Sequence, residues 1–170
     1  MATGEGRSTS NTVAIGLSAY KIIGWVAVLV FSGASIGAFA ARQYGPIILF
    51  ALFVALGIYL TLSAGRYILD DRGITHQNAF GVYRIAWREV QKIEVAPAAD
   101  QFEATAGSLV LYGEKKRFVV ASPFAWSGPH RAQAHALLAR KIAESGLTPI
   151  FSRAALLKSH KNVRVSSAEV

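Results

Sequence analysis

The stretch RIAWREVQKIEV, residues 84–95, decides which fold the second half of the chain can adopt. Its side chains alternate in polarity through Trp87, the alternation breaks at the charged pair Arg88-Glu89, and it begins again from Val90 to Val95. A period of two residues is typical of a β-strand with one buried face. The stretch is therefore predicted to form a strand, a corner and a second strand.

Short segments of the same kind surround this stretch. Turns that contain glycine separate them at Asp70–Gly73, Asn78–Gly81 and Gly113-Glu114, because glycine tolerates backbone conformations that other residues avoid. The predicted strands cover residues 67–69, 74–77, 81–87, 90–95, 108–112 and 117–122.

The segment that follows changes to a helical period. Its start and stop signals are Ser127 as N-cap, Pro129 in the first turn and Gly146 past the end. Ala134, Leu138 and Ile142 recur every four residues, so one helix face can pack on the sheet. Several strands followed by one helix predict an α+β domain: a small antiparallel sheet or partly open barrel, capped by a C-terminal helix.

The segments from residue 66 to residue 146 resemble the bacterial pleckstrin-homology-like domains that are attached to transmembrane helices. The resemblance rests on YILDDRGITHQ (67–77), GVYRIAWREVQKIEV (81–95), the hairpin SLVLYGEKKRFVV (108–120) and the terminal helix. It implies that Trp87 packs inside the barrel and that Val90 and Ile93 reach the same core. The full set of predicted core residues is Trp87, Val90, Ile93, Leu138 and Ile142.

Two long uncharged segments precede this domain. IIGWVAVLVFSGASIGAFAA fills the twenty positions between Lys21 and Arg42, and PIILFALFVALGIYLTLSAG runs from Pro46 to Gly65. At 1.5 Å per residue, each segment as a helix is about 30 Å long, which matches the hydrocarbon core of a bilayer. Because only residues 42–45 join the two segments, they predict an antiparallel transmembrane hairpin with both termini on one side.

The positions of Lys and Arg predict the orientation of this hairpin. The short turn holds only Arg42, whereas the other side carries Arg7, Lys21, Arg66, Arg72, Arg84 and Arg88. The positive-inside rule then predicts that both termini and the β domain lie in the cytoplasm, and the resemblance implies a bacterial inner membrane. An alternative is a cleaved signal peptide over residues 21–41, but its apolar run is long for a leader and a second apolar run follows.

A pattern of small residues marks the first apolar segment. Gly33, Gly37 and Ala41 recur every four residues, a spacing that lets helix backbones approach closely. Packing against Ala51 and Ala55 of the second segment is the favoured interpretation, and a contact with another subunit is the alternative. Neither segment contains an ionisable side chain, which argues against an ion or proton path.

The composition fits a membrane protein. Only 16% of the 170 residues are charged, well below the roughly 25% of soluble domains. The net charge of +8 suits an anionic lipid surface, and no nucleic-acid recognition motif accompanies it. The absence of cysteine from the sequence excludes disulfides and cysteine-based zinc sites.

The sequence offers no constellation for catalysis. No HExxH motif and no glycine-rich phosphate loop occur, and His130 and His135 are five residues apart rather than four. The adjacent Asp70 and Asp71 fit a solvated turn, and His135 fits a half-buried packing position. The sequence therefore predicts no enzyme, cofactor, metal site or small-molecule substrate.

Contact with lipid or with protein remains as the predicted function. Lys115, Lys116 and Arg117 form a basic hairpin that could meet anionic headgroups. Superfamily relatives that hold phosphoinositides use basic residues between their first two strands, but here that loop, Asp70–Gly73, is acidic on balance. The resemblance therefore favours a scaffold or accessory subunit that contacts other membrane proteins, for example by pairing along a strand edge.

These inferences divide the chain into four parts. Residues 1–20 form an N-terminal cytoplasmic segment, 21–65 the transmembrane hairpin, 66–146 the β domain, and 147–170 a basic tail. The tail is predicted to be flexible, although Ser152 could cap a short helix that carries Ala155, Leu156 and Leu157. The predicted function is a non-catalytic, membrane-anchored interaction module; an anionic-lipid-binding domain that uses Lys115–Arg117 is the alternative.

Overall fold

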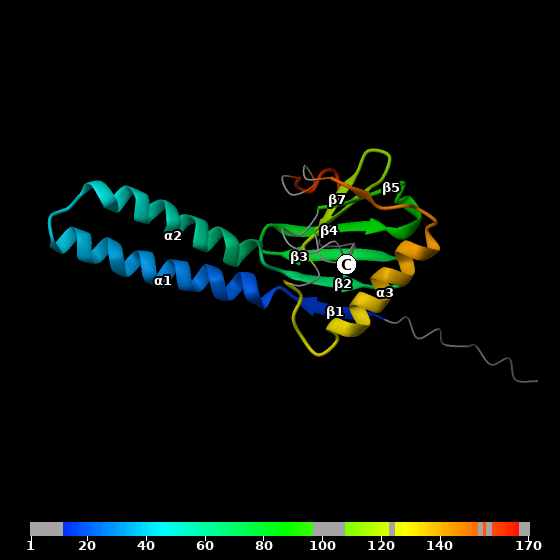
Figure 1. Ribbon diagram of the computed structural model, residues 1–170, viewed down its shortest axis with the longest axis horizontal. Coiled ribbons are helices and arrows are strands. Elements are labelled where there is room, and N and C mark those ends of the chain that lie inside the picture. The colour runs from blue at the N-terminus through cyan, green and yellow to red at the C-terminus, as the bar shows by residue number, and fades with distance from the viewer. Residues whose placement is uncertain (1–11, 97–107, 123–124, 153–154, 156–157, 167–170) are drawn as a thin grey trace, which may run out of the picture.

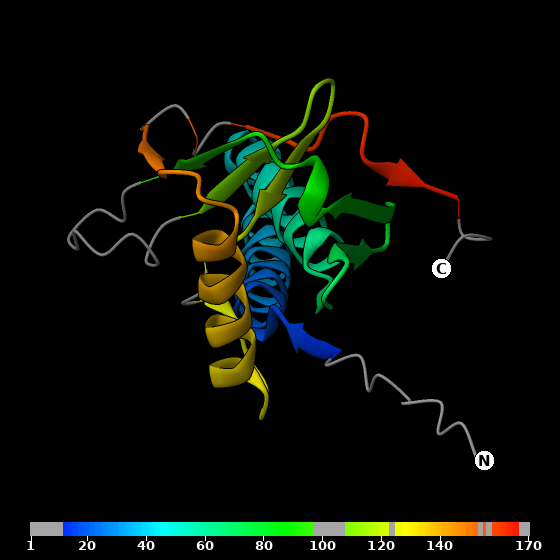
Figure 2. The same cartoon turned by 90° about the vertical axis from the view of Figure 1, so that its right-hand side faces the viewer.

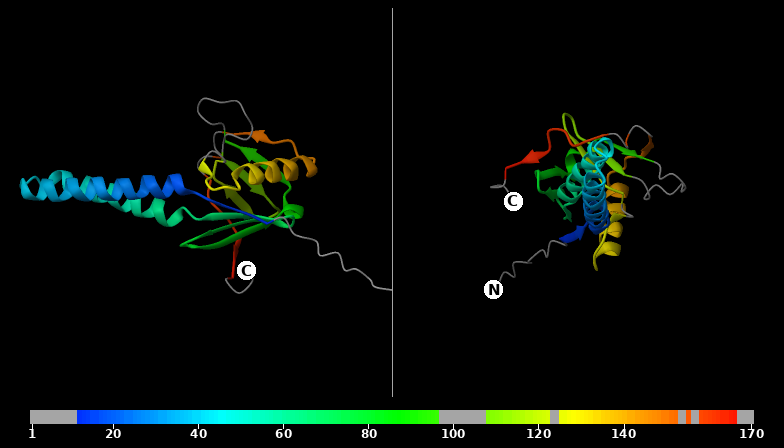
Figure 3. Two further views of the ribbon diagram at one scale, coloured as in Figure 1. Left: turned by 90° about the horizontal axis from the view of Figure 1, so that it is seen from below. Right: turned by 90° about the vertical axis from the view of Figure 1, so that its left-hand side faces the viewer.

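The computed structural model describes residues 12–96, 108–122, 125–152, 155 and 158–166 (Figure 1). Two long helices lie side by side and project as a rod from one end of a β domain, and a third helix packs against that domain (Figures 1 and 3). The α+β class predicted from the sequence is present.

The two long helices match the two apolar segments. Helix α1 spans Ser18–Ala40 and helix α2 spans Gly45–Ser63, with Pro46 in the first turn of α2 as expected. Both are long and apolar enough to cross a membrane. Only 6% of the most apolar window of each helix is buried, whereas a core helix of a soluble protein is mostly buried. The two apolar helices therefore support an association with a membrane.

The helices approach each other most closely at Gly24 and Gly57, not at the predicted glycine pattern. A Cβ on Gly57 would lie 2.7 Å from the carbonyl oxygen of Gly24, whereas a Cβ on Gly33 or Gly37 would meet nothing within 4 Å. The physical reason is rotation: Gly33 is nine residues, or two and a half turns, from Gly24, and therefore lies on the opposite face of α1. Gly33, Gly37 and Ala41 are all exposed, so the favoured packing against Ala51 and Ala55 is wrong.

The β domain contains two sheets. The five-stranded antiparallel sheet has the order β1-β2-β3-β4-β9, with β1 Val13–Gly16, β2 Arg66–Leu69, β3 Gly73–Asn78, β4 Gly81–Ala86 and β9 Arg164–Val165. The four-stranded mixed sheet has the order β7-β6-β5-β8, with β5 Lys92–Val95, β6 Leu109–Tyr112, β7 Arg117–Val120 and β8 Ile150–Phe151. The six strands predicted between residues 67 and 122 are all present, and the predicted corner is the short 3-10 helix η1, Trp87–Glu89.

The core lies between the two sheets and is closed by helix α3, Arg131–Glu144, on one side (Figure 2). Leu69, Ile85 and Phe118 are fully buried there, and α3 adds Leu137 and Leu138. Of the predicted core residues, Ile93 and Leu138 are buried, whereas Val90, Ile142 and Trp87 pack only at its margin.

Trp87 therefore differs from the expectation that it fills the barrel. It belongs to η1, and its indole Nε1 donates a hydrogen bond to the Asp70 carbonyl oxygen (2.8 Å) at the end of the domain. The buried tryptophan is Trp126, which is 2% exposed and donates from Nε1 to the Ala121 carbonyl oxygen (3.1 Å).

The N-terminal segment contributes a strand that the sequence did not predict. β1 pairs with β2 in antiparallel register, with Val13 opposite Leu69, and Ile15 is 2% exposed. Ser127 does not cap α3, which begins at Arg131; its backbone instead exchanges two hydrogen bonds with Gly16 (2.9 and 3.1 Å). The buried alternation of Val13 and Ile15 explains why this short segment joins the domain.

The described residues of the basic tail, 147–152, 155 and 158–166, are also part of the domain. β8 runs parallel to β5, and β9 pairs with β4. Between them, Ala155 covers Val110 on the outer face of the mixed sheet, and Lys158 Nζ lies 3.2 Å from a Glu94 carboxylate oxygen. The tail is held because that outer face is apolar and must be covered. Ala155 N–H donates to the Ser152 carbonyl oxygen (3.1 Å), while Leu156 and Leu157 of the predicted short helix lie outside the described residues.

Both long helices are joined to the β domain without a linker. α1 follows β1 through the buried Leu17, and α2 leads through the buried Ala64 into β2. The β3–β4 turn folds back on α2, where Ala79 N–H donates to the Leu62 carbonyl oxygen (3.2 Å) and Asn78 Nδ2 to that of Ser63 (3.3 Å). These contacts fix the direction of the helical rod relative to the sheets.

The glycine contact between α1 and α2 can be tested by a matched pair of substitutions. We expect Gly57→Ala to lower stability by about 1–3 kcal/mol, because the new Cβ forces two backbones apart. Gly33→Ala should not disturb the packing of the two helices, and it should raise stability by roughly 0.5–1 kcal/mol because alanine has a higher helix propensity than glycine. Thermal unfolding of the two variants in the same detergent measures the difference, and equal melting temperatures would contradict the assigned packing.

Candidate functional site

The β domain carries two hollows at its opposite ends. Because the β3–β4 turn contacts α2, the β2–β3 turn and η1 lie at the end away from the helical rod (Figure 1). The hollow at that far end, of about 750 Å³, is called the distal pocket. A second hollow of about 530 Å³, called the junction cavity, lies where the two long helices enter the domain.

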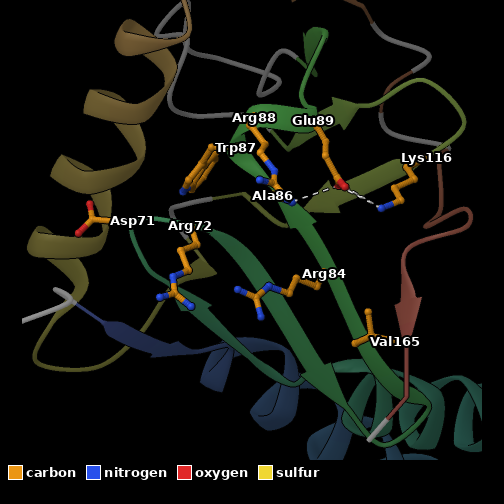
Figure 4. A pocket seen from close by; sticks show the side chains of 9 residues that line it. All are labelled: Asp71, Arg72, Arg84, Ala86, Trp87, Arg88, Glu89, Lys116 and Val165. Atoms are coloured by element: carbon orange, nitrogen blue, oxygen red, sulfur yellow. Dashed lines mark hydrogen bonds and ion pairs between the residues drawn. The ribbon is translucent and has the colours of Figure 1, made fainter. Parts of the chain in front are cut away.

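The distal pocket gathers cations from four separate segments. Arg72 comes from the β2–β3 turn, Arg84 from β4, Arg88 from η1 and Lys116 from the β6–β7 turn (Figure 4). The other lining residues are Asp71, Ala86, Trp87, Glu89 and Val165. Four cations and two carboxylates therefore surround the pocket.

Only some of these cations are neutralised by neighbours. Lys116 Nζ lies 3.0 Å from a Glu89 carboxylate oxygen, and this hydrogen bond is the main cause that holds the pKa of Glu89 below its usual value. Arg84 lies 3.7 Å from Asp70. Within the described part of the chain, the guanidinium groups of Arg72 and Arg88 have no hydrogen-bond or ion-pair partner.

The loop that looks acidic in the sequence does not cancel this charge. Asp71 lies within 3.2 Å of Arg140 and 3.5 Å of Lys141, two cations that α3 supplies. Asp70 accepts hydrogen bonds from the backbone N–H groups of Arg72 (2.8 Å) and Gly73 (2.7 Å). Both carboxylates are therefore engaged within the domain, and the pocket stays positive.

Trp87 holds the rim of the distal pocket in place. Its indole Nε1 donates to the Asp70 carbonyl oxygen (2.8 Å), and its backbone N–H donates to that of Arg72 (3.0 Å). These hydrogen bonds join η1 to the β2–β3 turn, so the backbone segments that carry Arg72 and Arg88 are held in a fixed relative position. Guanidinium groups bind carboxylates and phosphates through two parallel hydrogen bonds, so the pocket can hold an anionic group.

The predicted basic hairpin lies at this same far end. Lys116 pairs with Glu89, and Arg117 Nε donates to the Ser159 carbonyl oxygen (2.7 Å). Lys115 is exposed, and its carbonyl oxygen accepts from Asn162 Nδ2 (2.9 Å). The structure thus places the three predicted residues together, but two of them are used within the domain.

The junction cavity has a different lining, which is largely aromatic and uncharged. Tyr67, His76 and Tyr83 stand in register on β2, β3 and β4. Residues of α1, α2 and the tail complete it, among them Tyr20, Tyr59, Ser63, Lys158 and His160. The Tyr67 hydroxyl accepts from Ala121 N–H (3.0 Å) and donates to the Val119 carbonyl oxygen (3.3 Å), and burial raises its pKa well above the usual value.

The two histidines form a chain of hydrogen bonds with a defined direction. Val119 N–H donates to His160 Nδ1 (3.1 Å), so the proton of a neutral His160 ring sits on Nε2. That Nε2–H faces His76 Nδ1 at 3.2 Å, so His76 carries its own proton on Nε2. His76 Nε2 is buried and has no hydrogen-bond partner within the described residues.

Burial keeps both rings neutral. It lowers the pKa of His76 to about 4, and burial followed by the proximity of His76 lowers the pKa of His160 to about 4. The rings also pack tightly, since His76 stacks on Tyr67 and His160 on Tyr83 with centroids 4.4 and 4.5 Å apart.

No group of three or more potential ligand side chains that could hold a metal ion occurs among the residues that the structure describes. The chain was also compared with protein-family models, curated proteins and solved structures, and none of them matches it. The pleckstrin-homology-like resemblance therefore remains a prediction.

Of the residues that line the distal pocket, the sequence singled out Lys116 as a candidate contact and Trp87 as a core residue, but none of the three arginines. In the sequence, Arg72, Arg84 and Arg88 served only to predict the orientation of the transmembrane hairpin. Their proximity was not predicted, because it depends on how separate segments of the chain fold together. His76 and His160 are 84 residues apart, and the register of β2, β3 and β4 was the only available signal for the first of them.

The buried histidine chain predicts a loss of stability in mild acid. Unfolded histidine binds a proton near pH 6.5, whereas the folded rings bind one near pH 4, so stability is complete above pH 6.5 and falls as the pH drops toward 4. The loss should be on the order of 3 kcal/mol for each of the two rings by the time the pH reaches about 4. Hydrogen bonds from Lys92, and next from Tyr112, lower the pKa of Glu94 to about 2. Protonation of folded Glu94 therefore does not contribute to the loss of stability in this range.

Melting temperatures of the detergent-solubilised protein between pH 7.5 and 4.5 measure this loss. His76→Phe should flatten the pH dependence, since it keeps the stacking on Tyr67 and removes one titrating ring. His130→Phe, at an exposed position, should leave the pH dependence unchanged. An identical acid response in all three proteins would refute the assignment.

Proposed function

We propose that this protein is a non-catalytic, membrane-anchored interaction module that serves as an accessory or assembly subunit of a larger membrane protein complex. Helices α1 and α2 cross the bilayer, the β domain is of the pleckstrin-homology-like type, and the distal pocket binds an acidic segment of a partner protein. The observation that carries the proposal is the pair of exposed guanidinium groups, Arg72 and Arg88, that form no hydrogen bond or ion pair within the described domain, although the charge of Arg88 also acts on the neighbouring Glu89.

The linkerless junctions support this use of the domain. Because α1 continues from β1 and α2 continues into β2, the domain stands at one height and orientation above the bilayer. A pocket held in this way faces the aqueous compartment at a fixed distance from the membrane surface. Such geometry suits the positioning of a neighbouring subunit, because the ordering cost of binding is already reduced.

The orientation follows from the charges at the helix ends. Arg42 is the charged residue of the α1–α2 turn, whereas the domain side carries many cations. The positive-inside rule then favours a cytoplasmic domain and cytoplasmic termini, and the pleckstrin-homology-like resemblance favours a bacterial inner membrane.

The position of the basic hairpin favours protein contact over the alternative of lipid binding. Lys115–Arg117 lie beside the distal pocket, away from the helices that anchor the protein. Headgroups of the same membrane would lie at the other end of the domain. An acidic protein segment in the cytoplasm can reach the distal pocket, because it is not confined to the membrane surface.

The exposed face of α1 offers a second contact for the same complex. Gly33, Gly37 and Ala41 lie on the side of α1 that does not pack on α2. Small residues in this spacing suit close packing of a helix from another subunit.

Charge reversal in the distal pocket tests the proposal. We expect Arg72→Glu/Arg88→Glu to abolish co-purification of the partner after gentle detergent extraction, because two attractive contacts become repulsive. Size measurement and mass spectrometry of the extracted complex report the loss. The wild-type complex should also weaken with added salt, since salt screens exposed charges.

A matched control separates this contact from general charge effects. Lys115→Glu/Arg131→Glu changes the net charge equally at two exposed residues outside the distal pocket, and it should keep the partner bound. The proposal fails if the wild-type protein is extracted as a monomer without other proteins, or if both double variants behave alike.

A further inference from the structure

We propose that the junction cavity binds one acyl chain of a glycerolipid from the adjacent bilayer, with the acyl-ester carbonyl oxygen accepting a hydrogen bond from His76 Nε2–H. This inference rests on the membrane anchoring proposed above, and it does not depend on the distal pocket or its partner.

The first step concerns His76 Nε2–H, a buried hydrogen-bond donor that has no acceptor within the described residues. His76 is 6% exposed, its ring lines the cavity, and its Nε2 has no partner within the described residues. The hydrogen-bond chain from Val119 through His160 fixes the proton on this nitrogen. A buried donor without an acceptor costs about 1–3 kcal/mol, so an oxygen atom that reaches this buried nitrogen from the cavity gains that amount.

The second step is the location of the cavity. Tyr20 lies in the first turn of α1, and Tyr59 lies in the last turns of α2, so the lining includes both helices where they leave the apolar rod. Tyr59 and Phe80 pack with ring centroids 5.8 Å apart. Aromatic residues at such a position are typical of a membrane interface, and a lipid chain can therefore enter the cavity from the side of the bilayer.

The third step is the chemistry of the lining. The cavity volume of about 530 Å³ lies within the roughly 300–1,000 Å³ of small-molecule sites and suits one chain rather than a whole two-chain lipid. Its wall is mainly aromatic and aliphatic, with His76 as the donor inside. A largely apolar wall that holds one buried donor without a partner among the described residues matches an acyl chain that ends in an ester.

Charge distinguishes the ester from a free fatty acid. Lys158, the cation of the lining, already lies 3.2 Å from Glu94 and donates to the Tyr112 hydroxyl (2.7 Å). The neutral histidine chain supplies no positive charge. A buried carboxylate would lack a counter-ion, and such burial is costly, so an uncharged carbonyl oxygen is the acceptor.

Photo-crosslinking of the full chain in lipid nanodiscs tests the proposal. The probe is a lysophosphatidylcholine whose acyl chain carries a diazirine, and peptide mapping locates the label. We expect label on the cavity segments around Tyr67, His76 and Tyr83, in addition to any on the outer faces of α1 and α2. A fatty acid with the same diazirine should label these segments several-fold less.

Two variants test the roles of the donor and of the space. His76→Phe keeps the aromatic stacking on Tyr67 and should reduce cavity labelling about tenfold, which corresponds to the loss of one buried hydrogen bond. Ser63→Phe fills the cavity from α2 and should abolish cavity labelling while it leaves the histidine chain intact. His130→Phe is the control, and melting temperatures confirm that each variant is folded; if His76→Phe does not fold, Ser63→Phe carries the test.

Several outcomes overturn the inference. These are label confined to the outer faces of α1 and α2, cavity label unchanged in Ser63→Phe, stronger label from the free acid, or a nanodisc structure with only a water on His76 Nε2. Extraction with alkaline carbonate separates this failure from that of the proposed function. A chain that carbonate releases is not membrane-anchored, whereas an integral chain with an unlabelled cavity refutes the lipid site alone.

Discussion

The antiparallel pairing of β1 with β2 is the constraint on which the rest of the structure depends. Each of these neighbouring strands is continuous with one of the two long helices, so their hydrogen bonds hold the domain ends of α1 and α2 together. The exchange of backbone hydrogen bonds between Gly16 and Ser127 then ties the same point to the segment before α3. The angle of the helical rod, the lining of the junction cavity and the outward direction of the distal pocket all follow from this arrangement.

Because of this arrangement, the two ends of the β domain differ in charge and in exposure to solvent. At the junction, burial between the sheets and the helix ends removes water, and the two histidines there are neutral. At the far end, the turns are exposed, and Arg72 and Arg88 keep their charges in contact with solvent. An apolar, neutral end next to the apolar rod and a cationic end away from it give the protein a polarity that suits a membrane surface.

Sequence patterns predicted the features that depend on neighbouring residues. The strands between residues 67 and 122, the two apolar helices and the position of Gly146, which has a φ of 65° after α3, follow from local period and turn chemistry. The patterns did not predict β1, β8 and β9. β8 and β9 have only two residues each, which is too short for a periodic signal, and all three strands form by pairing with partners that are distant in the sequence. The same limit applies to both hollows, whose lining comes from segments far apart in the chain, and to the rotation that brings Gly24 rather than Gly33 against α2.

The tail connects these features: its described residues, 147–152, 155 and 158–166, pack on the β domain, which differs from the expected flexible basic segment. Among the described residues of the tail, Lys158 forms an ion pair with Glu94, and the backbone of Lys161 pairs with that of Arg117. The tail places His160 between two aromatic rings, with its centroid 4.5 Å from that of Tyr83 and 4.8 Å from that of Phe118. There its hydrogen bond to His76 Nδ1 fixes the His76 proton on Nε2. Without the tail, His76 Nδ1 would lose its donor and the ring could take either tautomer. The segment that covers the mixed sheet is therefore also the segment that gives the junction cavity its oriented hydrogen-bond donor.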